Sequence, residues 1–184
     1  MGGNVRRGAD IRLTVAARDA GHLAHLQAHV GSSGPIDAIT RGTRRYVGVR
    51  FWSPAMAADL ARHGVVERKT PLVAWPATVP PQLLRHYLRG YHDGDGWLCV
   101  RRWQYNSLEW GLVANLDFLR DCAAYLERTL GLKPPAVRRR NPDKPYGSMS
   151  YHGRLQVSRL WRFLNDGATI WLARKRDKVE PYVR

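Results

Sequence analysis

The chain has 184 residues, of which 44% are hydrophobic, and its 30 Lys and Arg against 15 Asp and Glu give a net charge of +15 at pH 7. This length suffices for one sizeable domain or two small lobes. Such a charge repels itself unless a polyanion binds, so nucleic acid is the first partner class to consider and an anionic membrane surface the second. Only five of the basic residues are lysines, and arginine suits phosphates and guanine edges.

The cysteines and the N-terminus bear on the cellular compartment. Cys99 and Cys122 have no partner at CxxC spacing, which excludes a zinc site or a disulfide framework and fits a reducing compartment. The N-terminal MGGNVRRGAD lacks the apolar core of a signal peptide, and no apolar run approaches a membrane span. We therefore expect a cytoplasmic, nucleoid-associated protein with no membrane partner.

The first half of the chain, residues 1–70, alternates strand and helix patterns. Apolar and polar residues alternate over 11–17, as in a half-buried strand, and Asp19 is placed to cap a helix that ends at Gly31. Residues 32–53 predict a hairpin with the basic turn RGTRR, and Ser53-Pro54 begins another helix. The next stretch contains four prolines, so we interpret residues 71–82 as a linker.

The second half, residues 83–184, follows the same order of elements. A helix-like run, LRHYLRGY, stops at an acidic, glycine-rich turn, DGDG, and a strand-like run follows. This run, residues 97–103, forms a strand pair with residues 108–114. After the pair come a helix capped by Asp117 and ended by Gly131, a second basic hairpin and a last helical region from Arg154. The order strand, helix, hairpin, helix thus occurs twice, with a shift of about 100 residues.

The stretch LRGYHDGDG at 88–96 resembles the nine-residue signature of the LAGLIDADG homing endonucleases. The matching residues are Leu88, Gly90, Asp93, Asp95 and Gly96. The resemblance implies a mixed α/β (α+β) fold built from αββαββα pseudo-repeats. In such a fold, antiparallel, saddle-shaped sheets carry their helices on one face and bind double-stranded DNA with the other.

The resemblance also implies roles for the motif residues. Asp95 lies where the family has its catalytic metal ligand, beside Gly96, and the expected cofactor is Mg²⁺ or another divalent cation. Asp93 would cap or hydrogen-bond the turn, and Gly96 would permit the sharp change from helix to strand. Gly90 would let the motif helix approach a twin helix closely.

The first repeat departs from the family because it lacks its motif helix. With Gly3 aligned to Gly96, Gly2 stands where the first metal-binding acid is expected. Three explanations are open: a native chain that starts earlier and acts as a monomer, a homodimer, or a remnant that no longer cuts.

The predicted DNA contacts come from both basic hairpins and from the ends of the two halves. In chain order they are Arg12, Arg44, Arg45, Arg50, Lys69, Arg101, Arg138, Arg140 and Lys175. A slip of one residue in the second half would replace some of these with Arg102 and Arg139. Lys69 and Lys175 could instead interact with helix C-termini.

Two further groups have ordinary interpretations. His22, His25 and His29 share a helix face, but no Cys or acidic residue lies at ligand spacing, so we expect surface histidines. Three tryptophans of the second half could stack on bases or fill the interface between sheet and helices; they are Trp97, Trp103 and Trp110, and Trp161 and Trp171 are expected in the core.

The sequence therefore predicts a protein that binds double-stranded DNA and cleaves phosphodiester bonds site-specifically with Mg²⁺, an endonuclease of the hydrolase class. Loss of the first acid would impair cleavage. The main alternative is a non-cleaving DNA-binding regulator or splicing-assisting protein, and a third is an RNA-binding module.

Overall fold

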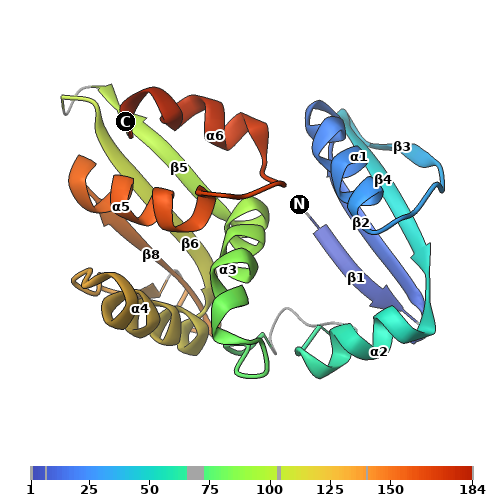
Figure 1. Cartoon of the computed structure of the whole chain (residues 1–184), viewed down its shortest axis with the longest axis horizontal. Coiled ribbons are helices and arrows are strands. Elements are labelled where there is room, and N and C mark those ends of the chain that lie inside the picture. The colour runs from blue at the N-terminus through green and yellow to red at the C-terminus, as the bar shows by residue number, and fades with distance from the viewer. Residues whose placement is uncertain (1, 7, 66–72, 103–104, 140, 184) are drawn as a thin grey trace. The chain divides into compact units, whose positions relative to one another are not determined.

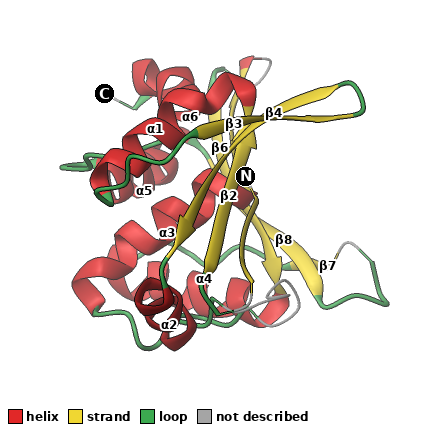
Figure 2. Ribbon diagram, turned by 90° about the vertical axis from the view of Figure 1, so that its right-hand side faces the viewer, coloured by secondary structure: helices red, strands yellow, loops and turns green. Residues whose placement is uncertain are grey.

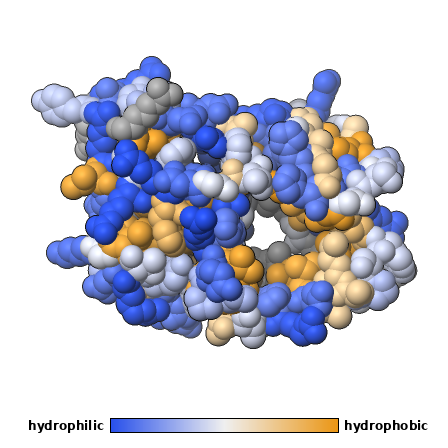
Figure 3. Space-filling view, in the orientation of Figure 1, coloured by the Kyte–Doolittle hydropathy of each residue, from blue (hydrophilic) through white to orange (hydrophobic). Residues whose placement is uncertain are grey.

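The computed structural model describes residues 2–6, 8–65, 73–102, 105–139 and 141–183. The chain forms two compact units, Met1–Lys69 and Thr70–Arg184, called here the N-terminal and C-terminal units. Among the described residues, no helix is both long and apolar enough to cross a membrane. The face drawn in Figure 3 is largely hydrophilic, with hydrophobic atoms in patches between.

The N-terminal unit contains a four-stranded antiparallel sheet in the order β1-β2-β4-β3. Two helices pack on it: α1 contacts β2 and β4, and α2 contacts β2 (Figure 1). In chain order the elements are β1 (Gly2–Arg6), β2 (Asp10–Ala16), α1 (Ala20–His29) after a 3₁₀ turn at Ala17–Asp19, β3 (Ile36–Arg41), β4 (Arg44–Trp52) and α2 (Pro54–Arg62).

Alternation along the strands decides which face of this sheet meets the helices. Ile11 and Val15 of β2 are buried with Val49 of β4 against Leu23 of α1 and Ala57 of α2. Arg12 and Thr14 of β2 point to the other face, because successive side chains of a strand alternate. We call that other face, which no described helix of this unit covers, the N-terminal open face.

The C-terminal unit repeats this plan with the strand order β5-β6-β8-β7. Figure 2 shows its helices on one side of β6 and β8. The elements are α3 (Pro81–Asp95), β5 (Gly96–Arg101), β6 (Ser107–Asn115), α4 (Leu116–Leu130), β7 (Arg138–Arg139), β8 (Tyr146–His152), α5 (Arg154–Asn165), α6 (Ala173–Val179) and a 3₁₀ turn at Glu180–Tyr182.

The core of this unit lies between β6 and helices α4 and α5. Leu108, Trp110 and Leu112 of β6 are fully buried, as are Phe118 of α4 and Leu160 of α5. Their spacing of two along β6 places them on one face of the strand. The opposite face, which carries Trp97, Arg101 and Glu109, is called the C-terminal open face.

The pairing register relates the two units. Gly3 pairs with Leu13 in the first sheet, and Gly96 pairs with Leu112 in the second, so Gly3 and Gly96 hold equivalent positions. The predicted fold class is confirmed: the described residues form a mixed α/β fold with two four-stranded antiparallel sheets and six α-helices.

Two predicted helix caps need correction. The side chain of Asp19 makes no capping hydrogen bond at the start of α1. Helix α4 begins two residues earlier than predicted, and the side chain of Asn115, rather than Asp117, accepts the capping bond from the Asp117 backbone N–H at 2.9 Å. The predicted end of α4 is confirmed, since Gly131 has the left-handed φ of 61° that favours glycine there.

Candidate functional site

The signature forms the end of helix α3 and the start of strand β5. Leu84, Leu88 and His92, four residues apart, are buried on one side of the helix, which is the spacing of a single helix face. Asp95 is the last helical residue and its side chain is exposed. Gly90 is also exposed, and a Cβ at this position would meet no atom within 4 Å.

Glycine at position 96 is required by crowding. Gly96 stands between α3 and β5 with a φ of −101° and a ψ of 170°, which any residue can adopt, so backbone conformation is not what requires glycine there. A Cβ here would lie 2.2 Å from Cδ2 of His92 and 2.8 Å from the carbonyl oxygen of Gly111. The helix can therefore turn directly into the edge strand β5 only without a side chain at this position.

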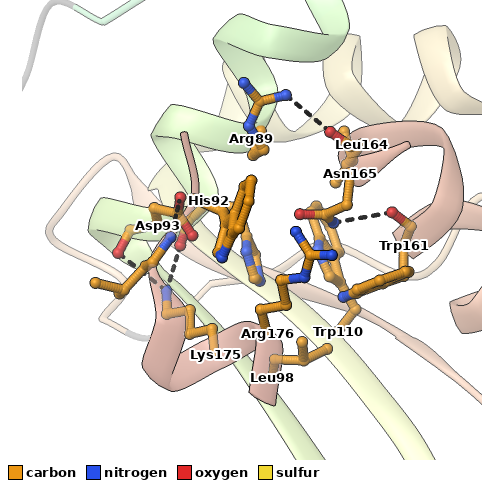
Figure 4. Close-up of a pocket in the computed structure, with 12 residues that line it drawn as sticks. Arg89, His92, Asp93, Leu98, Trp110, Trp161, Leu164, Asn165, Lys175 and Arg176 are labelled. Atoms are coloured by element: carbon orange, nitrogen blue, oxygen red, sulfur yellow. Dashed lines mark hydrogen bonds between the residues drawn. The ribbon is translucent and has the colours of Figure 1, made fainter. Parts of the chain in front are cut away.

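Lys175 of α6 is buried, with 8% of its surface exposed. Its ammonium donates hydrogen bonds to the carbonyl oxygens of Gly96 at 2.6 Å, of Asp93 at 3.1 Å, and of His92 (Figure 4). The prediction of a DNA contact at Lys175 is therefore wrong. Lys175 instead takes the other predicted role, interaction with a helix C-terminus. The last carbonyls of a helix have no partner within the helix, and a cation can bond them.

Asp93 also joins α3 to α6, here with an acceptor on α3 and a donor beside α6. Its buried carboxylate accepts a hydrogen bond at 3.1 Å from the backbone N–H of Leu172, the residue before α6. Asp93 thus bonds a segment distant in sequence, where the motif predicted a bond within its own turn. Arg89, half-buried one turn earlier, donates to the carbonyl oxygens of Leu164 and Ile170, so the motif helix holds the whole connection between α5 and α6.

His92 is a buried, neutral residue beneath the sheet. Its ring stacks on Trp110, with centroids 4.7 Å apart and planes 11° apart. Because the facing group, 3.1 Å from Nε2, is the carbonyl oxygen of Trp97, Nε2 carries the proton. Burial, with the nearby Lys175 charge as a smaller cause, lowers the pKa of His92 to about 3.

Asp95 fits as one ligand of a divalent cation, since it is an exposed hard-oxygen donor. Gly96 does not fit, because its carbonyl oxygen already accepts from the Lys175 ammonium. Within the described residues, no group of three His, Cys, Asp or Glu side chains is placed to hold a metal. Gly2, which has no carboxylate, precedes Gly3 as Asp95 precedes Gly96, but Gly2 belongs to β1 whereas Asp95 ends α3.

A buried carboxylate organises the arginines of the N-terminal open face. Arg12 and Arg50 are cross-strand partners, and both bond Asp10, Arg12 through Nε and Nη2 and Arg50 through Nε at 2.8 Å. Asp10 is only 4% exposed. The hydrogen bond from Arg12, together with Arg50, outweighs the effect of burial and lowers the pKa of Asp10.

The remaining arginines of the first hairpin do not share one face. Arg44 alternates in phase with Arg50 and lies on the N-terminal open face. Arg45 lies on the side of Val47 and Val49, the helix side, although it is exposed near the hairpin turn. Arg45 therefore does not share a sheet face with Arg44 and Arg50, as predicted, since adjacent strand residues point in opposite directions.

The C-terminal open face has the same arrangement. Glu109 is 4% exposed and accepts from Nε1 of Trp97 at 2.9 Å and from Nε of Arg101 at 2.7 Å. Burial raises the pKa of Glu109, and these hydrogen bonds outweigh it, so the pKa lies below its usual value. By register, Glu109 is equivalent to Asp10.

Arg138 pairs with Ser148 and shares the C-terminal open face with Arg101, so the predicted register holds without a slip. Arg139 pairs with Gly147 on the opposite side, and Arg102 lies beyond the end of β5. Lys69 and Arg140 lie outside the described residues.

The aromatic and histidine predictions have mixed outcomes. Trp110 and Trp161 are buried in the core, as one interpretation expected. Trp97 lies on the C-terminal open face over Gly111, and Trp103 is outside the described residues. Trp171 is only partly buried, with the guanidinium of Arg176 4.0 Å from its ring centroid. The three histidines of α1 belong to no metal-holding group in the described part of the chain.

Sequence reasoning missed both buried acids of the open faces. The available signal was an acidic residue at an alternating strand position in a chain with twice as many basic as acidic residues. Such a carboxylate is rarely buried without a cationic partner.

Comparison with known proteins shows the fold. No protein-family model and no curated protein matches the sequence. The structure resembles the LAGLIDADG homing endonuclease I-SmaMI bound to cleaved DNA, with a TM-score of 0.57 and 10% identity over 93% of this chain and 76% of that one. It also resembles the LAGLIDADG homing endonuclease I-GzeII in complex with its DNA target, with a TM-score of 0.56 and 11% identity over 92% and 77% of the two chains.

A third similar structure is full-length DUF199/WhiA from Thermatoga maritima. Its TM-score is 0.56 with 15% identity, and the match covers 98% of this chain and 55% of that one. At these identities the likeness concerns the fold alone, which is the fold that the signature at 88–96 implied.

Proposed function

We propose that the protein binds double-stranded DNA with the open faces of its two sheets. The observation that carries this proposal is a buried acid on the open face of each sheet that bonds exposed arginine side chains, two in the first unit and one in the second. Arg12 and Arg50 form this arrangement with Asp10, and Arg101 forms it with Glu109. The net charge of +15 and the fold shared with structures that contain DNA support the same function.

The chemistry of these arginines suits a duplex. A strand face that is free of helices can lie in the major groove, where arginine contacts phosphates and guanine edges. The bonds to Asp10 use Nε of Arg50 and leave its two terminal nitrogens toward solvent. A guanidinium held in this way loses less conformational entropy on binding than a mobile one.

The salt dependence of binding tests this proposal. Each phosphate contact contributes about 0.9 to the slope of log affinity against log salt concentration for B-DNA. Arg50→Gln should lower this slope by about one and weaken binding. Arg120→Gln is the matched control, since Arg120 is an exposed arginine on helix α4, paired with Asp117, and this substitution should leave the slope unchanged. Equal effects of the two substitutions would refute the assignment of the open face.

Cleavage is a second candidate function, favoured by the exposed carboxylate of Asp95 at the end of α3. A bound Mg²⁺ would supply Lewis-acid activation of water and stabilise the leaving oxygen. Asp95 would hold this ion with phosphate oxygens and water. Gly2 precedes Gly3 in the first unit as Asp95 precedes Gly96 and has no carboxylate, and a second copy of the chain would bring a second Asp95.

Incubation of a duplex library with the protein and Mg²⁺ separates the two candidates. Nicking that Asp95→Asn abolishes, with binding retained, would establish an endonuclease. Binding without cutting at any protein concentration would leave a DNA-binding regulator or splicing-assisting protein. Tighter binding to structured RNA than to duplex DNA at matched salt would overturn both.

A further inference from the structure

A pocket of about 180 Å³ opens on the N-terminal unit where β2 begins and β4 ends. Its walls come from Arg6, Asp10, Arg12, Arg50 and Trp52. Trp52 is the cross-strand partner of Asp10, and Arg6 pairs with Asp10 from the other side. The pocket is smaller than the roughly 300 Å³ at which pockets for drug-sized ligands begin, so it fits part of a larger molecule.

The charge of the pocket selects an anion. Three arginines and one carboxylate line the pocket, which leaves two net positive charges. Asp10 takes Nε and Nη2 of Arg12 but only Nε of Arg50, and the terminal nitrogens of Arg50 have no partner within the described residues. Two adjacent N–H donors of one guanidinium match two oxygens of a phosphate.

Trp52 gives the pocket an aromatic wall. It is 64% exposed, which is unusual for so large a side chain. The guanidinium carbon of Arg50 lies 5.6 Å from the ring centroid, and this cation–π contact orients the indole. The exposed ring is available to stack with a flat partner that arrives together with the anion.

We infer that this pocket takes a nucleotide whose base is unpaired, with its phosphate on the arginines and its base stacked on Trp52. A nucleotide supplies both parts, a phosphate and a flat ring at a fixed separation. A base within a duplex has its faces covered by its neighbours, whereas an unpaired base can be turned out onto an aromatic side chain. The inference extends the proposed function, because duplex DNA would bring the unpaired nucleotide to this face.

The experiment compares two labelled duplexes of about two helical turns by fluorescence anisotropy at one salt concentration. One is fully paired, and the other carries a single unpaired thymidine near its centre. Base–aromatic stacking corresponds to about 5- to 150-fold in affinity, so the wild-type protein should prefer the second duplex by a factor in this range.

Two variants test whether the preference for the unpaired thymidine depends on Trp52. Trp52→Leu should abolish the preference, so that this variant binds the two duplexes with equal affinity. Tyr105→Leu removes an aromatic side chain that is 99% exposed in the C-terminal unit and should keep the preference. Circular dichroism of each variant checks that it is folded.

The outcomes separate this inference from the function on which it rests. Equal affinity of the wild-type protein for both duplexes, or a preference that survives Trp52→Leu, overturns the nucleotide pocket and leaves duplex binding intact. Trp52-dependent binding of the unpaired thymidine without measurable binding of the paired duplex supports the pocket and overturns duplex binding. Binding of neither duplex overturns both.

Discussion

Replacement of Lys175 by methionine should destabilise the C-terminal unit while leaving DNA binding almost unchanged. Methionine keeps most of the aliphatic stem and removes the ammonium that donates to three carbonyl oxygens around the end of α3. Lys178 on the same helix is exposed, so Lys178→Met removes the same charge without a buried contact.

The expected loss follows from the contacts. Hydrogen bonds to a charged donor contribute about 1.5–3 kcal/mol each, but removal of the ammonium also removes its desolvation cost of several kcal/mol. The carbonyl of His92 also keeps a partner, the backbone N–H of Gly96. We therefore expect a loss of about 3 kcal/mol in the free energy of unfolding, near the lower end for breaking a buried charge contact.

Urea unfolding followed by tryptophan fluorescence measures this loss selectively. Of the seven tryptophans, only Trp52 belongs to the N-terminal unit, so the signal reports mainly the C-terminal unit. Lys175→Met should shift the midpoint with an unchanged slope m, and Lys178→Met should change the free energy by less than about 0.5 kcal/mol. Equal midpoints for the two variants, with weaker DNA binding by Lys175→Met alone, would refute the buried placement of Lys175.

Three further outcomes are expected. The pKa of His92 is lowered to about 3 in the folded protein, so as pH falls from 6.5 toward 3 the unfolded chain binds a proton that the folded chain does not. The free energy of unfolding should therefore fall by up to about 1.4 kcal/mol per pH unit. His92→Gln should remove this part of the slope in urea melts recorded across this pH range. Glu109 has a lowered pKa in the folded protein, so its carboxylate stabilises the fold above the unfolded pKa near 4.5 and loses this effect as pH falls through the lower pKa of the folded state. Glu109→Gln should therefore make the free energy of unfolding less dependent on pH below about 4.5. Gly96→Ala should cost about 1–3 kcal/mol by overpacking, whereas Gly90→Ala should add up to about 1 kcal/mol of helix stability; equal thermal melting temperatures of the two variants would contradict the crowding at Gly96.

Local patterns predicted the elements well because their signals are local. Alternation over residues 11–17 identified β2, and Ser53-Pro54 identified the start of α2, where the Ser53 hydroxyl accepts from the Met56 N–H. The choice between Asn115 and Asp117 as the cap of α4 was missed because both residues cap well and lie two positions apart.

The candidate site was predicted only in part because its contacts span long sequence separations. The motif placed Asp95 at a helix end, but nothing near it in sequence identifies Lys175 as the partner of the preceding carbonyls. Similarly, alternation placed Arg12 and Arg50 on one face, whereas the burial of Asp10 between them depends on a cross-strand register that joins residues about 40 positions apart.

The contact between Lys175 and the end of α3 has a consequence for biosynthesis. Asp95 leaves the ribosome about 80 residues before Lys175, an interval of roughly 4 to 16 s at ordinary translation rates. Throughout this time, the carbonyls at the end of the motif helix lack the ammonium that they bond in the finished protein. The N-terminal unit, whose sheet and helices all lie within its own residues, can fold meanwhile. The motif helix is thus completed last, and a nascent chain that stops before α6 carries the signature sequence without its folded terminus.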